Sequence, residues 1–149
     1  MFNEDPLVVQ EVLDSITGAV MVYVVDDGSD VPLPELKHSS MIHLRLSENM
    51  GQGYSLSYGI KKALEDGCEY FCTMDADGQH LFSDLEKLLF PVINDEADVV
   101  IGSRFKAEND VPIFKKLMLK MGILLHHLLF RIKTSHTHNG LRAFNKKAA

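Results

Sequence analysis

The chain has 149 residues, of which 46% are hydrophobic and 24% are charged, and its formal net charge is -6. This length and composition suit one globular domain with a single hydrophobic core, which we expect to span residues 1–149. The acidic balance argues against a general nucleic-acid-binding protein, because binding to phosphates requires a basic face.

The cysteines and the hydropathy pattern bear on cellular location. Cys68 and Cys72 are too few for a disulfide framework or a cysteine metal site, so we expect reduced thiols in a cytoplasmic protein. The N-terminus shows no basic segment followed by an apolar run, and no stretch reaches about 18 uncharged apolar residues. We therefore expect neither a signal peptide nor a membrane span.

The first predicted element is a helix, and a strand follows it. Asp5 is a good N-cap, Pro6 suits the first helical position, and Gly18 can end the helix. The valine-rich run at residues 19–25 is typical of a strand that is buried on both faces.

Strands and helices then alternate along the chain. Ser83 and Glu86 have the spacing of a capping box, which predicts a helix that starts there and ends near Asn94. Another helix should run from the turn at 49–53 to about residue 66, strands are expected at 41–46, 69–74 and 97–101, and residues 140–144 suit a short strand or a turn. This alternation predicts an α/β fold with a mostly parallel sheet and flanking helices, where ligands bind at the carboxyl ends of strands.

Asp75 and Asp77 form the first of two acidic clusters that follow predicted strands. Two carboxylates at this spacing can converge on one Mg²⁺ or Mn²⁺, and Gln79 adds a neutral oxygen ligand. Such a metal neutralises the charge that develops on a diphosphate leaving group. The plainer alternative is a solvated acidic turn. A calcium loop is excluded, because His80 stands where that loop requires glycine.

Asp26 and Asp27 form the second cluster. A carboxylate here can accept hydrogen bonds from a nucleobase N–H or a ribose hydroxyl, and the small residues Gly28 and Ser29 allow a ligand to approach the backbone. The alternative is again a polar turn after a strand.

Six short motifs occur in order along nearly the whole chain. They are Phe2-Asn3-Glu4, Val25-Asp26-Asp27-Gly28-Ser29, Asn49-Met50-Gly51-Gln52-Gly53, Asp75-Ala76-Asp77-Gly78-Gln79-His80, Gly102-Ser103-Arg104 and Thr137-His138-Asn139-Gly140-Leu141-Arg142-Ala143-Phe144. Together they resemble the motifs of glycosyltransferase family 2, which has the GT-A fold, and within it the group similar to dolichyl-phosphate mannose synthase.

The resemblance implies a role for each motif. The nucleoside-diphosphate sugar would be bound by Phe2, Glu4, Asp26, Asp27, Gly51, Asp75 and Ala76. Asp75, Asp77 and Gln79 would hold Mg²⁺ or Mn²⁺, and Arg104, His138, Asn139 and Arg142 would face the acceptor or phosphate charge. Catalysis would involve Asp77, His136 and Arg104.

The chain departs from the family pattern in three places. The family's first strand, expected just before Phe2 and between the strands at 19–25 and 69–74, is missing, which would leave two unpaired sheet edges inside the domain. The chain also stops soon after its last motif, so we expect a truncation at both ends. His136 stands where the family usually has an aspartate near the acceptor.

Residues 111–133 form an amphipathic segment rich in lysine and arginine. Such a helix can lie on an anionic membrane surface near a lipid-linked acceptor, at the inner face of the membrane, or it can be an ordinary core helix. Both interpretations stay open, as does the oligomeric state.

Three functions are therefore weighed. The first is a glycosyltransferase that moves a sugar from a nucleoside-diphosphate sugar to a polyprenyl phosphate or glycan acceptor, with inversion. The second is an inactive fragment of such an enzyme. The third, a phospho-receiver signalling domain, is disfavoured because Gly102-Ser103-Arg104 follows the late strand where a receiver has a lysine.

Overall fold

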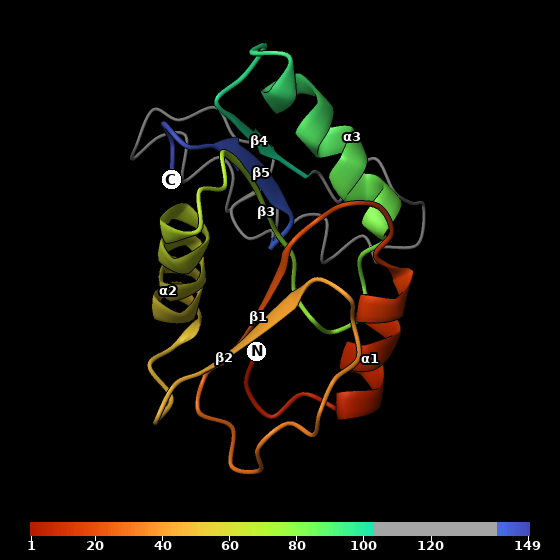
Figure 1. The fold of residues 1–149 in the computed structure, drawn as a ribbon, viewed down its shortest axis with the longest axis vertical. Coiled ribbons are helices and arrows are strands. Elements are labelled where there is room, and N and C mark those ends of the chain that lie inside the picture. The colour runs from red at the N-terminus through yellow and green to blue at the C-terminus, as the bar shows by residue number, and fades with distance from the viewer. Residues whose placement is uncertain (103–139) are drawn as a thin grey trace, which may run out of the picture.

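A computed structural model describes residues 1–102 and 140–149 (Figure 1). In chain order, the elements are α1 (Pro6–Ser15), β1 (Val22–Asp26), β2 (Met41–Arg45), α2 (Gln52–Glu65), β3 (Tyr70–Thr73), α3 (Phe82–Ile93), β4 (Val99–Ile101) and β5 (Arg142–Asn145). The predicted α/β alternation is confirmed. The segment at 111–133 lies outside the described residues, as do Arg104, His136, His138 and Asn139.

The helix starts show where local sequence rules hold and where they fail. Asp5 caps α1 as predicted, because its carboxylate accepts a hydrogen bond of 2.9 Å from the backbone N–H of Leu7. The predicted capping box of α3 is wrong. That helix begins at Phe82 with Leu81 at the N-cap and no side-chain cap, so Ser83 already lies inside the first turn.

The strands form two separate sheets among the described residues. β1 and β2 pair in parallel, with Val22 opposite Met41 and Asp26 opposite Arg45. β5 pairs antiparallel with both β3 and β4 and lies between them. The expectation of a mostly parallel sheet is therefore met by one of the three described pairings. The two other pairings are antiparallel. The sequence left the segment at 140–144 open as a strand or a turn, and this segment forms β5, which inserts between β3 and β4. Because β3 and β4 run in the same direction, β5 is antiparallel to both.

Helices flank both sheets. In Figure 1, α2 lies on one side of the strands, and α1 and α3 lie on the other. One core cluster joins Val9 and Leu13 of α1 to Val24 and Leu36. A second joins Ala63 of α2 to the stacked rings of Phe71 and Phe144, whose centroids are 5.4 Å apart.

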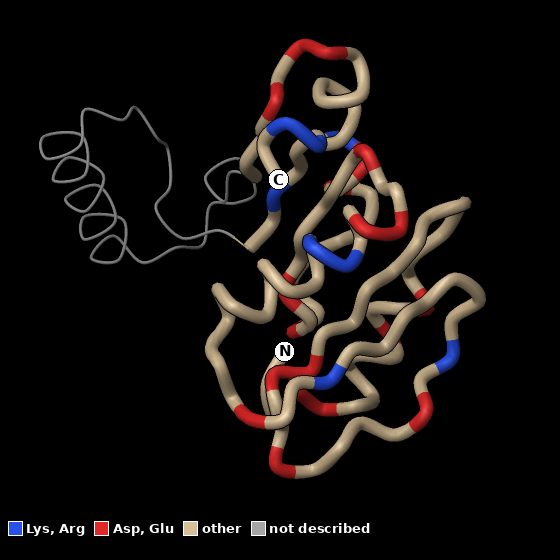
Figure 2. The backbone as a smooth tube through the Cα atoms, turned by 60° about the vertical axis from the view of Figure 1, so that its left-hand side comes forward, with Lys and Arg blue, Asp and Glu red and all other residues tan. Residues whose placement is uncertain are grey.

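Two surface properties agree with the composition. Figure 2 shows acidic residues recurring along the described backbone, with lysine and arginine scattered between them, so the described residues form no basic stretch of the kind that nucleic-acid binding needs. Within residues 1–102 and 140–149, no helix has the length and apolar character needed to cross a bilayer.

Candidate nucleotide and metal site

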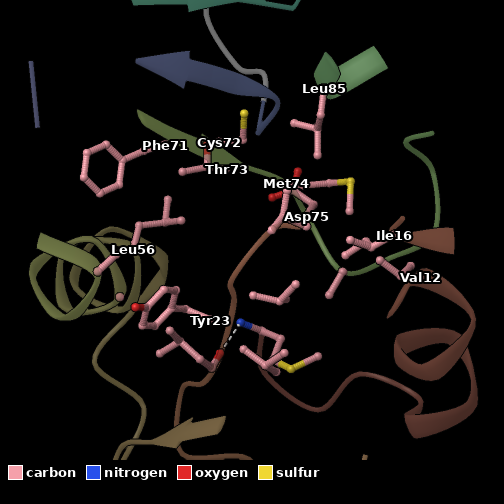
Figure 3. Close-up of a pocket in the computed structure, with 18 of the residues that line it drawn as sticks. Val12, Ile16, Tyr23, Leu56, Phe71, Cys72, Thr73, Met74, Asp75 and Leu85 are labelled. Carbon is pink, nitrogen blue, oxygen red and sulfur yellow. Dashed lines mark hydrogen bonds between the residues drawn. The ribbon is translucent and has the colours of Figure 1, made fainter. Parts of the chain in front are cut away.

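A large cavity separates the two sheets. Its volume is ≈ 1020 Å³, and it lies between β1 and β3 with helices around it. Figure 3 shows Leu56 of α2 on one side, Val12 of α1 and Ile16 just after it on the other, and Leu85 of α3 above. The walls are mainly apolar, and polar residues come from the loops that follow the strands.

Most of the predicted nucleotide and metal residues line this one cavity. They come from the N-terminal segment, the loop after β1, the start of α2 and the loop after β3. The residues are Phe2, Glu4, Asp27, Gly51, Asp75, Ala76 and Asp77. The fold thus brings Asp27 and Asp77 to the same cavity, although they follow different strands in different sheets.

Asp26 is the last residue of β1, and its side chain is fully buried. It accepts a hydrogen bond of 2.9 Å from the backbone N–H of Ser29 and forms an ion pair with Arg45, which stands opposite in β2. Burial alone would raise the pKa of Asp26, but the hydrogen bonds from Ser29 and the charge of Arg45 outweigh it and hold the pKa below its usual value. Asp26 therefore contacts the protein, and its predicted contact with a nucleotide stays a prediction.

Asp27 ties the loop after β1 to the start of α2. Its two carboxylate oxygens accept 2.9 Å hydrogen bonds from the backbone N–H groups of Met50 and Gly51. Burial tends to raise the pKa of Asp27, but these bonds and the Ser55 hydroxyl lower it overall. No side chain caps α2, whose N-cap is Gly51, and Asp27 instead holds the backbone immediately before the helix.

Gly28 explains how the two loops come so close. Its φ of +71° lies in the left-handed region, and a Cβ there would stand 2.3 Å from the carbonyl carbon of Glu48. Only glycine satisfies both conditions without moving the backbone. The loop after β1 is therefore in direct contact with the loop after β2, and this contact holds Asp27 beside α2.

Asp75 is held between α2 and the start of the last described segment. Its Oδ1 accepts a hydrogen bond of 3.0 Å from the side-chain amide of Gln52. A Cβ on Gly140 would lie 2.2 Å from Asp75 Oδ2, so the carboxylate packs directly on that glycine. The carbonyl of Gly140 in turn accepts a 2.8 Å hydrogen bond from the Thr73 hydroxyl.

Asp77 shapes its own turn. Its Oδ1 accepts a 3.0 Å hydrogen bond from the backbone N–H of Gln79, whose side chain does not line the cavity. In the described part of the chain, no three histidine, cysteine, aspartate or glutamate side chains gather as a metal site.

Arg142 begins β5 and lines a second cavity of ≈ 320 Å³, so the fold does not place it at the larger one.

Three positioning residues were missed by sequence reasoning. Gln52 and Gly140 both stand inside quoted motifs, so their positions were visible although their contacts with Asp75 were not. Arg45 carried no local signal, because only the register of β1 on β2 brings it to Asp26.

Comparison with known proteins agrees with the sequence motifs. A family model described as Glycosyl transferase family 2 matches residues 1–149. The chain is 37% identical, over 72% of its length and 44% of the relative's, to UDP-N-acetylglucosamine--dolichyl-phosphate N-acetylglucosaminyltransferase of Methanococcus voltae.

Two further relatives are similar over most of the chain. An uncharacterized protein of Methanocaldococcus jannaschii is 35% identical over 99% of this chain and 63% of its own length. The low-salt glycan biosynthesis hexosyltransferase Agl6 of Haloferax volcanii is 26% identical over 84% of this chain and 30% of its own. The matches span less than two thirds of the length of each relative.

Proposed function

We propose a sugar-transfer function from one premise: the chain belongs to glycosyl transferase family 2. In this proposal it has the GT-A fold and moves a sugar from a nucleoside-diphosphate sugar to an acceptor, with Mg²⁺ or Mn²⁺. One observation carries the proposal: Glu4, Asp27 and Gly51 line the same cavity as Asp75 and Asp77. A nucleoside on the first group would direct its diphosphate toward the second.

The donor set suits a hard divalent cation. Asp75 and Asp77 each use Oδ1 in a hydrogen bond within the protein, and no described residue bonds to either Oδ2. Mg²⁺ is commonly held by one or two carboxylates and completed by substrate phosphates, so a site of this kind does not require three acidic side chains. When bound, the cation would neutralise the diphosphate as it leaves.

The residues of the chain position the reactants. Transfer forms a bond between the acceptor oxygen and the anomeric carbon while the bond from that carbon to the diphosphate breaks. This inverts the configuration and leaves the electron pair on the nucleoside diphosphate. Gln52 and Gly140 hold Asp75 in place, and Asp27 holds the start of α2 at the cavity.

The acceptor class is proposed from the relatives and from the chemistry of the attacking oxygen. One relative is named for dolichyl phosphate and another for glycan biosynthesis. An acceptor hydroxyl needs a base to remove its proton, whereas a phosphate monoester, with a second pKa of about 6, is already an anionic nucleophile at neutral pH. His136 stands where the family usually has an aspartate, and a histidine can also serve as the base that a hydroxyl acceptor needs, so residue 136 does not decide between the two acceptors. The relative named for dolichyl phosphate favours a lipid phosphate acceptor. The roles of Arg104, His138, Asn139 and Arg142 at the acceptor remain part of this proposal, as does contact of residues 111–133 with the membrane.

Calorimetry with UDP, GDP and Mn²⁺ tests the site. We expect nucleoside-diphosphate binding that requires the metal and weakens at least about tenfold in Asp77→Asn, because one carboxylate ligand is lost. Asp14→Asn is the matched control, since Asp14 lies exposed on α1 and does not line the cavity. Absence of metal-dependent binding to either nucleotide, in a protein that is folded by circular dichroism, would reject the proposal.

A further inference from the structure

The segment before α1 alternates in what its side chains contact. Phe2 and Glu4 line the large cavity, whereas Asn3 between them does not. Asn3 is exposed, and its side chain bonds to Asp30 in the loop after β1. The two residues of this segment that reach the cavity are therefore joined by one that contacts a neighbouring loop.

Asn3 and Asp30 are joined by two hydrogen bonds of opposite direction. The side-chain amide of Asn3 donates to Asp30 Oδ2 at 2.7 Å, and its side-chain oxygen accepts from the backbone N–H of Asp30 at 2.9 Å. One side chain thus uses a donor and an acceptor on the same partner. An amide offers both, whereas an ionised carboxylate in its place could only accept.

The backbone of Asn3 is held as well. Its N–H donates to the hydroxyl of Ser29 at 2.9 Å, and its φ of 53° lies in the left-handed region, which asparagine tolerates better than most residues. The conformation of one residue sets the relative direction of its two neighbours, so it sets how Phe2 and Glu4 enter the cavity. Asn3, Ser29 and Asp30 together form a clasp between the N-terminal segment and the loop after β1.

Ser29 connects the clasp to the sheet. Ser29 is buried, its backbone N–H donates to Asp26 at 2.9 Å, and its carbonyl accepts from Arg45 at 2.7 Å. Because Asp26 and Arg45 stand opposite each other in β1 and β2, Ser29 is fixed by the register of the two strands. The clasp therefore ties the N-terminal segment to the most rigid part of its surroundings.

The bonds of the clasp affect local order more than global stability. Both bonds between Asn3 and Asp30 are exposed, and water can replace a partner that is lost there. Residues 1–4 belong to no helix or strand, so a few contacts hold them in place. A segment of this kind detaches without unfolding the rest of the domain. Loss of the clasp should therefore release Phe2 and Glu4 alone.

We propose that the clasp positions Phe2 and Glu4 for the nucleoside of the donor. This inference rests on the proposed function, in which these two residues contact that nucleoside. Asn3 is a positioning residue, since it does not reach the cavity. With the clasp closed, the ring of Phe2 and the carboxylate of Glu4 are ordered before the donor arrives, so binding does not have to order them. The clasp therefore sets the affinity for the donor and not the rate of sugar transfer.

An exchange of two side chains tests the pairing. Asn3→Asp places two carboxylates against each other and should open the clasp. Asn3→Asp combined with Asp30→Asn restores one amide and one carboxylate, with the donor now on residue 30, and should close it again. Asn3→Gly keeps the positive φ but removes the side chain. Asp95→Gly is the matched control, because Asp95 also has a positive φ, of 56°, and does not line the cavity.

Two measurements follow the clasp and its effect. Calorimetry with UDP or GDP and Mn²⁺ measures nucleotide affinity. Hydrogen exchange of the backbone N–H groups of Asn3 and Asp27, which bond to Ser29 and Met1, measures whether the segment stays attached.

We expect each single variant of Asn3 to weaken binding and to speed exchange at least about tenfold, and the exchanged pair to return both to within about twofold of the parent. Asp95→Gly should match the parent, and the unfolding midpoint should move by less than about 3 °C in every variant. In a transfer assay the loss should fall on the KM for the donor, with kcat within about threefold.

Faster exchange with unchanged nucleotide affinity would overturn the proposal, as would exchange that stays as slow as in the parent. An exchanged pair that stays weak would reject the pairing of Asn3 with Asp30, and a loss confined to kcat would reject a role in donor binding. A parent that binds neither nucleotide would reject the proposed function and with it the nucleoside role of the clasp. That failure is distinct from the others, because it appears in the parent before any substitution.

Discussion

The carboxylate of Asp75 rests on the backbone of Gly140, where a Cβ would come within 2.2 Å of Oδ2. Gly140 begins the segment that leads into β5, and Asp75 leaves β3, the strand that β5 pairs with. The hydroxyl of Thr73 donates a 2.8 Å hydrogen bond to the carbonyl oxygen of Gly140. This bond opposes any movement of the glycine away from Asp75. Pairing of β5 on β3 therefore sets the position of a candidate metal ligand.

Gly140→Ala should misplace Asp75 without unfolding the protein. The added methyl group displaces the carboxylate, and a shift of about 1 Å in a catalytic group typically lowers rates by about 100-fold. Under the proposed function, transfer from a labelled nucleoside-diphosphate sugar to a lipid phosphate acceptor should fall by about 10- to 100-fold, while circular dichroism stays unchanged.

Gly53→Ala is the control for this substitution. Gly53 lies in α2, where an added methyl group would meet no atom within 4 Å, and alanine favours a helix. Its transfer rate should stay within about twofold of the parent. Equal losses in both variants would show that the Asp75 contact has no special role.

Asp26→Asn should destabilise the fold rather than affect the cavity directly. Asparagine keeps the shape but loses the charge that pairs with Arg45, and removing a buried charged hydrogen bond costs about 2 kcal/mol of unfolding free energy. Urea unfolding measures this loss. Asp84→Asn removes an exposed ion pair with Lys87 and should change stability by less than about 0.5 kcal/mol. Similar losses in the two variants would contradict the buried role of Asp26.

The same residue predicts a pH dependence of stability. The pKa of Asp26 is below its ordinary value of 3.8 in the fold, so the unfolded chain takes up the proton first as pH falls. Its contribution to stability is complete above about pH 4 and is lost as the pH falls through the lower pKa of the folded state. The stability gap between the parent and Asp26→Asn should therefore narrow as the pH falls below about 4, as measured by urea unfolding. A gap that widens toward low pH would refute this sign.

Local rules predicted the elements but not how they meet. Asp5 and Pro6 set the start of α1 because capping is decided within one turn of helix. The capping box predicted at Ser83 was wrong because a serine near the start of a helix does not identify which residue is the N-cap. The position of β5 depends on pairing with β3 and β4, which short-range patterns do not encode.

For the candidate site too, the sequence predicted which residues take part but not their contacts. The motifs named residues that the fold gathers at one cavity, because loops at the ends of β1 and β3 meet there. They did not reveal that Asp26 turns inward, since Arg45 reaches it only through the parallel register of β1 on β2.

Substitution at residue 136 distinguishes the two acceptor classes. A glycan hydroxyl loses its proton during attack and needs a base, whereas a lipid phosphate attacks as an anion. If dolichyl phosphate is the acceptor, His136→Ala should keep transfer within about threefold, and His136→Asp should not accelerate it, because no proton has to be removed. If a glycan hydroxyl is the acceptor, His136→Ala should lose about 100-fold or more, and activity should follow the protonation of the histidine. Labelled transfer to both acceptors, measured from about pH 5.5 to pH 8.5, separates these outcomes. A large loss with dolichyl phosphate would mean that residue 136 has a role beyond proton removal and would remove the chemical argument for a phosphate acceptor.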